Sequence, residues 1–373
     1  MRHYTSDDCE DISRVFYQVY PSNLSFPDGI DISLSGQPTS AMNVVMSLVA
    51  SISIHPTQFP ANIQRDLLES IRTRCINHKF HYDSVKQTQK WLQVHQTYSP
   101  SRTDPDVIAI YDQSFTTATA SIGASNVHCV GIGCGGGQKD TRLLRLLQHQ
   151  AKQVAYTPAD VSTAMTLVAR EIASSVISAD DCHPLVCDLA TAQDLPQVLD
   201  ELVDPEDSRL ITCFGILPNF RPGLILPKLA ALVRSGDFLL LSANLAPGKN
   251  YAAGVRSILP SYDNTLTTNW LMTLLNDLGV DSGDGTIQFG VEACPDGTRL
   301  KRICAQFTFL RERTLNIGKE SFEFQPEESV QLFFSYRHTP KDLEANLPNY
   351  GLKLVQQWIS RSEEEGIFLC RKF

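Results

Sequence analysis

Between residues 127 and 243, hydrophobic positions follow two alternating patterns. Short apolar runs typical of buried strands are separated by longer segments whose apolar residues recur every three or four positions, as on one face of a helix. The runs that predict strands are 127–132, 153–157, 184–187, 209–215 and 238–243. The helical patterns between them are 141–152, 162–176, 195–202 and 222–233. Because parallel strands need crossover connections of about this length, the pattern predicts an α/β fold with a doubly wound, mostly parallel sheet.

The alternation of strands and helices stops after Gly248. Residues 249–340 combine a helical pattern at 266–278 with longer alternating strands at 303–311 and 330–336. Such a mixture is typical of an antiparallel or mixed sheet. We therefore expect a second, smaller α+β unit in this part of the chain.

Three further segments complete the outline. Residues 60–97 have a mostly helical pattern. Residues 352–358 and 366–371 predict two strands joined by a charged turn, which would close the main sheet with an antiparallel edge. Residues 1–55 are interrupted by proline and glycine and are predicted to form an irregular extension.

Composition and charge narrow the class of protein. The net charge of -9 comes without any polybasic run, so the positive surface that a nucleic-acid partner requires is missing. The longest apolar stretch, 41–54, is too short and too polar to span a membrane, and no signal segment opens the chain. The ten cysteines include no CxxC pair, so no metal site is predicted. We expect a cytoplasmic protein with a small-molecule or protein partner.

A glycine cluster ends the first predicted strand and opens the helix after it. Gly131, Gly133 and Gly135 belong to this cluster. A doubly wound sheet binds ligands at this position because the backbone can approach closely and the helix N-terminus presents free N–H groups. A Walker-type loop would end in Gly-Lys-Ser or Gly-Lys-Thr, which is not found here. The dinucleotide spacing GxGxxG is nominally met, so the glycines alone leave NAD open.

Two acids after the next strands favour a different cofactor. Asp160 follows the second strand, where a carboxylate can accept hydrogen bonds from ribose hydroxyls. Asp188 follows the third strand, where a methyltransferase places the acid that binds the adenine amino group. Because a second nucleotide-binding half is missing, this set fits S-adenosylmethionine better than NAD. The alternative for Asp160 is that it only precedes a helix that begins at Ser162.

An ordered series of short motifs runs through the chain. They are residues 80–83 (Phe-His-Tyr-Asp), 98–104 (Tyr-Ser-Pro-Ser-Arg-Thr-Asp), 139–144 (Lys-Asp-Thr-Arg-Leu-Leu), 156–162 (Tyr-Thr-Pro-Ala-Asp-Val-Ser), 219–222 (Asn-Phe-Arg-Pro) and 262–263 (Tyr-Asp). Together they resemble the histidine-specific methyltransferase family of ergothioneine biosynthesis, whose wider group includes the dimethylallyltryptophan N-methyltransferases. The resemblance extends from about Lys79 to the C-terminus.

The resemblance implies a methyltransferase that uses S-adenosylmethionine to methylate the amino group of an amino-acid-like small molecule. It also implies a methyltransferase domain (106–248 and 341–373) and a substrate-binding domain made of two segments (56–105 and 249–340). The second boundary agrees with the change of pattern after Gly248.

Individual roles follow from the matching positions. The resemblance implies cofactor contacts at Gly133, Asp160 and Asp188, and we add Gly131, Gly135 and Lys139 from the same loop as candidates. It further implies that three residues surround the amino and carboxylate groups of the substrate. Of these, Asn219 and Tyr262 are assigned to orient the reacting nitrogen as catalytic residues, and Tyr82 to bind the carboxylate.

The chain departs from the family pattern where a Glu-x-Ser should bind the imidazole of histidine. The aligned positions begin at Leu332 and end at Phe334, and both are predicted to line the substrate pocket. Sliding the alignment by one residue recovers Ser335 but puts Phe333 in the place of the acid. Because strand side chains alternate, only one of the two phenylalanines can face the pocket. We therefore expect an acceptor other than histidine, with an indole, phenyl or prenylated ring.

Two other functions stay open at this point. The chain could be a methyltransferase-like binding or partner subunit without activity, or an NAD-dependent oxidoreductase. Three histidines at 78, 81 and 95 lie close in sequence, but their spacing forms no metal-binding face, so we expect them to be surface or packing residues.

Overall fold

The computed structural model describes residues 50–150, 152–295 and 297–373. The irregular extension predicted for residues 1–55 lies outside the described residues up to position 49. Its last part differs from the prediction, because β1 (Ser53–Ile54) pairs in parallel with β4 (Leu185–Val186) at the edge of the main sheet. A strand of two residues is too short to produce a recognisable hydrophobic alternation.

The main sheet has eight strands in the order β1-β4-β3-β2-β5-β6-β13-β12. Its other strands are β2 (Asn126–Ile132), β3 (Gln153–Asp160), β5 (Ser208–Cys213), β6 (Phe238–Asn244), β12 (Leu352–Ile359) and β13 (Glu365–Lys372). The strands from β1 to β6 are parallel to their neighbours, and β13 runs antiparallel to both β6 and β12. The predicted doubly wound sheet and its antiparallel closing pair are thus confirmed.

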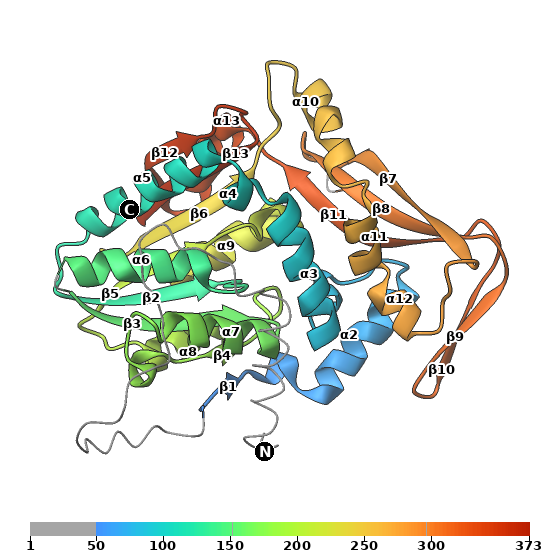
Figure 1. Ribbon diagram of the computed structural model, residues 1–373, viewed down its shortest axis with the longest axis horizontal. Helices are drawn as coiled ribbons and strands as arrows, with labels where there is room; N and C mark the ends of the chain where they lie inside the picture. Colours follow the sequence, from blue (N-terminus) through green and yellow to red (C-terminus); the bar gives the residue numbers. More distant parts are fainter. Residues whose placement is uncertain (1–49, 151, 296) are drawn as a thin grey trace, which may run out of the picture. The chain divides into compact units, whose positions relative to one another are not determined.

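Helices cover both faces of this sheet (Figure 1). One layer contains α5 (Pro105–Ser121), α6 (Gln138–His149) and α7 (Thr163–Ala173). The other contains α8 (Leu195–Leu202), α9 (Pro222–Leu232) and α13 (Pro340–Asn346). Neighbouring residues of β2 alternate between the two cores: Cys129 packs under α5 and α6, and Val130 packs under α8 and α9. This alternation explains why the strands read as continuous apolar runs.

A second group of elements has its own core. It contains α2 (Pro60–Arg72), α3 (Val85–Tyr98), α4 (Pro100–Thr103), α10 (Tyr251–Ile258), α11 (Thr265–Leu271), α12 (Thr273–Asp277), β7 (Gly285–Ala293), β8 (Lys301–Phe309), β9 (Arg313–Ile317), β10 (Glu320–Phe324) and β11 (Ser329–Arg337). Strands β11, β8 and β7 form an antiparallel sheet, and β9 pairs with β10. In this core, α2 packs with α11 and with the inner faces of β8 and β11. Helix α2 precedes the main sheet in the sequence, whereas the other three elements follow β6. The helix predicted at 266–278 is divided at Met272.

Among the described residues, no helix is long and apolar enough to cross a membrane.

Candidate active site

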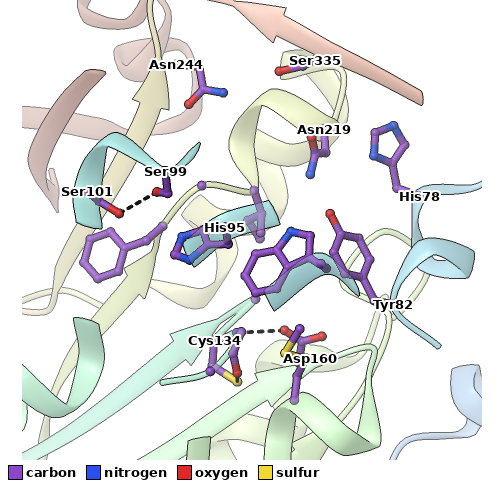
Figure 2. Close-up of a pocket in the computed structure, with 18 of the residues that line it drawn as sticks. His78, Tyr82, His95, Ser99, Ser101, Cys134, Asp160, Asn219, Asn244 and Ser335 are labelled. Carbon is purple, nitrogen blue, oxygen red and sulfur yellow. Dashed lines mark hydrogen bonds between the residues drawn. The ribbon is translucent and has the colours of Figure 1, made fainter. Parts of the chain in front are cut away.

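A cavity of about 590 Å³ lies at the carboxyl ends of β2, β3, β4 and β5. From β2, the sheet continues through β3 and β4 on one side and through β5 and β6 on the other. The cavity therefore lies at the switch point where doubly wound sheets bind ligands. Its opposite wall is built by the turn at His78–His81, by α3, α11 and β11. The close-up of the cavity shows side chains from both walls pointing toward one another (Figure 2).

The glycine loop leads from β2 into α6, and its backbone lines the cavity. Gly133 has a φ of +62°, and a Cβ there would lie 2.6 Å from the side chain of Ile216. Gly135 has a φ of +52°, which a residue with a side chain adopts only with strain. Both glycines line the cavity. The candidate Gly131 does not: a Cβ there would lie 2.3 Å from a carboxylate oxygen of Asp140, so this glycine makes room for a buried acid.

Asp160, at the end of β3, contacts the glycine loop and lines the cavity. Its carboxylate accepts hydrogen bonds from the backbone N–H of Gly135 (3.1 Å) and of Ser162 (3.0 Å). Burial raises the pKa of this carboxyl, and the backbone donors partly offset the effect. The side chain of Ser162 caps α7, so the helix does not use Asp160 as its cap. Asp160 lines the cavity, and each carboxylate oxygen, which already accepts one of these backbone hydrogen bonds, has a further lone pair for a ligand.

Asp188 follows β4 and is 3% exposed. One of its oxygens, Oδ1, accepts a hydrogen bond from the backbone N–H of Ala190 at 2.8 Å. The other, Oδ2, is buried and has no hydrogen-bond partner, although Lys79 Nζ lies 3.6 Å away. Lys79 itself forms a shorter ion pair with Asp66 at 2.5 Å. Because a buried acceptor without a partner is costly, Oδ2 is well suited to a ligand donor.

Lys139 lines the other end of the cavity, at the start of α6. Its Nζ donates a hydrogen bond to the hydroxyl of Tyr111 (3.2 Å), which in turn donates to Glu365 (2.6 Å). Burial lowers the pKa of Lys139. Arg102 in α4 also lines this end and donates to a ring nitrogen of His95. The cations of Lys139 and Arg102 lie at this end of the cavity together with the carboxylate of Glu365.

The three predicted substrate residues, Tyr82, Asn219 and Tyr262, all line the cavity. The hydroxyl of Tyr82 points toward the side chain of Asn219, and burial raises the pKa of the phenol (Figure 2). Asn219 ends a 3₁₀ turn, Leu217–Asn219, that packs between β11 and β6. The hydroxyl of Tyr262 donates to Ser335 Oγ at 3.0 Å and accepts from Arg337 at 2.7 Å. The structure therefore brings Tyr82, Asn219 and Tyr262 together.

The prediction for Leu332 and Phe334 is wrong in register. A β-bulge in β11 inserts Leu332 between the paired residues Gln331 and Phe333, and Leu332 packs into the core. Phe334 faces a separate hollow on the far side of the strand. Phe333 and Ser335 line the cavity in their place. Strand alternation places their side chains on the same face, as the alignment shifted by one residue would require.

Aromatic residues that the sequence analysis did not assign form much of the substrate wall. The ring centroid of Phe333 lies 5.0 Å from that of His78 and 5.9 Å from those of Trp270 and Tyr262. Tyr82 contacts Trp270 (5.5 Å) and Trp91 (5.9 Å). Their sequence spacing gives no signal for this convergence, because the rings come from three separate segments.

Two of the histidines expected at the surface or in packing also belong to the wall. His78 and His95 line the cavity, and burial lowers the pKa of each well below its usual value. His78 Nε2 accepts a hydrogen bond from the backbone N–H of Phe334 at 3.4 Å, so Nδ1 carries the proton and has no partner. His81 instead packs beneath the site, hydrogen-bonded to the carbonyl of Leu332 at 2.6 Å.

A glycine loop after the first parallel strand, with acids after the next two, is typical of class I methyltransferases. Comparison with protein families agrees: the model of the family described as "Histidine-specific methyltransferase, SAM-dependent" matches residues 61–372. The chain belongs to this family, and the protein is a methyltransferase that uses S-adenosylmethionine. An NAD-dependent oxidoreductase is therefore not supported.

Comparison with curated proteins gives no match. Solved structures with a weak likeness to this chain include the CcbJ methyltransferase from Streptomyces caelestis, with 13% identity and a TM-score of 0.36 over 70% of this chain and 94% of that one. They also include CalS10, an amino pentose methyltransferase from Micromonospora echinaspora, with 14% identity and a TM-score of 0.37 over 75% of this chain and 97% of that one.

The described residues fit this cofactor. The Oδ2 of Asp188, which has no hydrogen-bond partner and lies 3.6 Å from Lys79 Nζ, can accept the adenine amino group, and Asp160 can accept ribose hydroxyls. Gly133 and Gly135 let the backbone itself line the cavity, and Lys139 with Arg102 offers positive charge for a carboxylate tail.

Proposed function

We propose that the protein methylates the amino nitrogen of an amino-acid-like small molecule with an apolar or aromatic side chain, and that histidine is not its natural acceptor. The observation that carries the proposal is the wall formed by Phe333, Trp270 and Ser335. Burying an imidazole leaves one donor and one acceptor to satisfy, at roughly 1–3 kcal/mol each if they stay unpaired. Ser335 supplies one hydroxyl, but Phe333 takes the place where the family carries an acid.

The acids among the cavity-lining residues that the structure describes lie elsewhere. Asp160 ends β3, Asp188 follows β4, Asp140 lies in the first turn of α6, and Glu364 and Glu365 lie beside β6. Beside the hydroxyl of Ser335 and the imidazole of His78, the side-chain wall consists of the rings of Phe333 and Trp270, which favour an apolar group by about 25 cal/mol for each Å² buried. Aromatic rings also stabilise one another when they pack edge to face.

S-adenosylmethionine supplies a methyl group on a sulfonium: the nitrogen lone pair bonds to the methyl carbon, the carbon–sulfur bond breaks, and its electron pair stays on sulfur. The chain has to hold a neutral amine in line with that bond. We assign this alignment to Asn219 and Tyr262, which both line the cavity. The buried, largely apolar wall disfavours the ammonium form of the substrate. The proton released after methylation leaves to water.

We further propose that the two parts of the chain divide this work. Residues 106–248 and 341–373 would hold the cofactor, and residues 56–105 and 249–340 would hold the substrate. Asn219 would reach from the first part to the substrate nitrogen, and Arg102 from the second to the cofactor. The separate core of the second group supports this division.

The test is a competition assay. Histidine, tryptophan and phenylalanine are offered together with S-adenosylmethionine, and the methylated products are compared by mass spectrometry. The proposal expects a higher specificity constant for an aromatic amino acid than for histidine. A clear preference for histidine would overturn the acceptor assignment, and the lack of any methylated amine, with cofactor binding intact, would support an inactive binding subunit.

A further inference from the structure

Arg337 is a buried cation in the substrate wall. It ends β11, two residues beyond Ser335 and on the same face of the strand, and it lines the cavity while only 5% exposed. One terminal nitrogen donates to the hydroxyl of Tyr262 at 2.7 Å, and the other approaches the carbonyl of Leu245 at 3.5 Å. Its Nε is buried and has no hydrogen-bond partner.

No acid among the described residues lies within ion-pair distance of this guanidinium. Glu364 and Glu365 line the same cavity, but neither pairs with it, and Glu365 accepts a hydrogen bond from Tyr111. The other strongly buried arginines each have a carboxylate partner: Arg209 pairs with Asp200, and Arg302 with Glu292. Arg337 is therefore the exception, and it faces the cavity.

A buried charge without a counterion is strongly unfavourable, so the geometry calls for an anion from outside the chain. A guanidinium binds a carboxylate through two parallel hydrogen bonds, and Nε with a terminal nitrogen forms one such edge. The bond to Tyr262 holds the guanidinium plane in place for this contact.

Two carboxylates could reach the cavity, one on the cofactor and one on the substrate. Lys139 and Arg102 already supply positive charge beside the start of α6. Arg337 instead donates a hydrogen bond to Tyr262, which in turn donates to Ser335. These residues belong to the proposed acceptor wall, so the substrate carboxylate is the better match.

We propose that Arg337 binds the carboxylate of the methyl acceptor, so that the substrate class is amino acids with a free carboxylate and not the corresponding amides or decarboxylated amines. This inference rests on the proposed function and moves the carboxylate contact from Tyr82 to Arg337. Tyr82 then contributes its ring to the wall and its hydroxyl to Asn219.

The test compares the free acid and the amide of whichever of tryptophan, phenylalanine and histidine the wild-type enzyme methylates best. Loss of a charge-assisted pair should cost roughly tenfold or more in kcat/KM, mainly through KM. We expect this loss for the amide with the wild-type enzyme, and for the acid with Arg337→Gln. The amide should react equally well with both enzymes, and Arg337→Lys should recover part of the activity on the acid.

Three measurements keep the outcome unambiguous. Calorimetry with S-adenosylhomocysteine should give the same affinity for wild type and Arg337→Gln; a matched loss would assign Arg337 to the cofactor carboxylate and overturn the proposal. The control Arg302→Gln removes a buried arginine from the neighbouring strand β8, outside the cavity, and should keep the preference for the acid. Equal rates for acid and amide with the wild-type enzyme would also overturn the proposal.

If the wild-type enzyme methylates no amine, the proposed function fails, but the carboxylate site can still be tested. Calorimetric binding of free tryptophan to the enzyme loaded with S-adenosylhomocysteine should be weakened by Arg337→Gln and not by Arg302→Gln. Equal binding to all three enzymes would contradict the inference independently of the reaction.

Discussion

Replacing Asp188 with asparagine isolates one contact of the cofactor site. The two side chains have nearly the same shape, and the amide oxygen can keep the 2.8 Å hydrogen bond from Ala190. What changes is Oδ2, the buried atom with no hydrogen-bond partner, which becomes an NH₂ group that can only donate. An adenine amino group also donates, so an attractive contact becomes a repulsive one.

The expected magnitude follows from this exchange. A hydrogen bond to a charged group contributes roughly 1.5–3 kcal/mol, which corresponds to about a 10- to 150-fold change in affinity. Lys79, 3.6 Å from Oδ2, keeps its closer partner Asp66, so the fold should tolerate Asp188→Asn. Calorimetry with S-adenosylhomocysteine measures the affinity, and thermal unfolding without ligand checks the fold.

The matched control is Asp181→Asn, which removes an exposed acid shortly before β4. It should leave both affinity and unfolding temperature unchanged. If Asp188→Asn binds S-adenosylhomocysteine as tightly as wild type while the fold is intact, Asp188 does not hold the adenine and the cofactor assignment is refuted.

Three further predictions concern the acceptor wall and the pH dependence of stability. Asn219→Ala and Tyr262→Phe should each lower the rate of methyl transfer with little change in cofactor affinity by calorimetry; equal losses of both would place these residues in the cofactor site. Phe333→Glu should shift the specificity constant toward histidine by roughly tenfold or more, because it restores an acid beside a hydroxyl; an unshifted preference would contradict the assigned register. Burial lowers the pKa of His81 to about 4, from an ordinary value near 6.5. The folded state therefore takes up this proton less readily than the unfolded state. Between about pH 6.5 and 4, the contribution of His81 to the free energy of unfolding should fall by about 1.4 kcal/mol per pH unit as the pH is lowered. Chemical denaturation should show a weaker pH dependence for His81→Gln, and an identical pH dependence would count against this assignment.

Most of the main sheet could be predicted from the sequence because its strands are long, apolar and separated by helices. The short edge strand β1 could not, since two residues show no period. The helix expected at 266–278 divides at Met272, where the backbone leaves the regular helical hydrogen-bond pattern although the apolar pattern continues. Tertiary packing decides such local breaks.

The convergence of the cofactor candidates was easier to predict than that of the acceptor candidates. Asp160 and Asp188 follow neighbouring parallel strands, whose carboxyl ends must meet at one edge of the sheet. The wall of β11 depends on a bulge that reverses which residues face the cavity, and the hydrophobic pattern does not reveal an inserted residue such as Leu332. Arg337 was missed because the absence of an acidic partner is a property of the folded structure, not of the sequence.

The most direct test of the whole account is to follow an isotopically labelled methyl group from S-adenosylmethionine to the acceptor. The enzyme is incubated with labelled cofactor and tryptophan or phenylalanine, and the position of the label in the product is determined by fragmentation in the mass spectrometer and by NMR. We predict that the label appears on the α-amino nitrogen, and that transfer is reduced by Asn219→Ala. A label on oxygen or carbon, or no transfer to any free amino acid while S-adenosylmethionine binds normally, would contradict it.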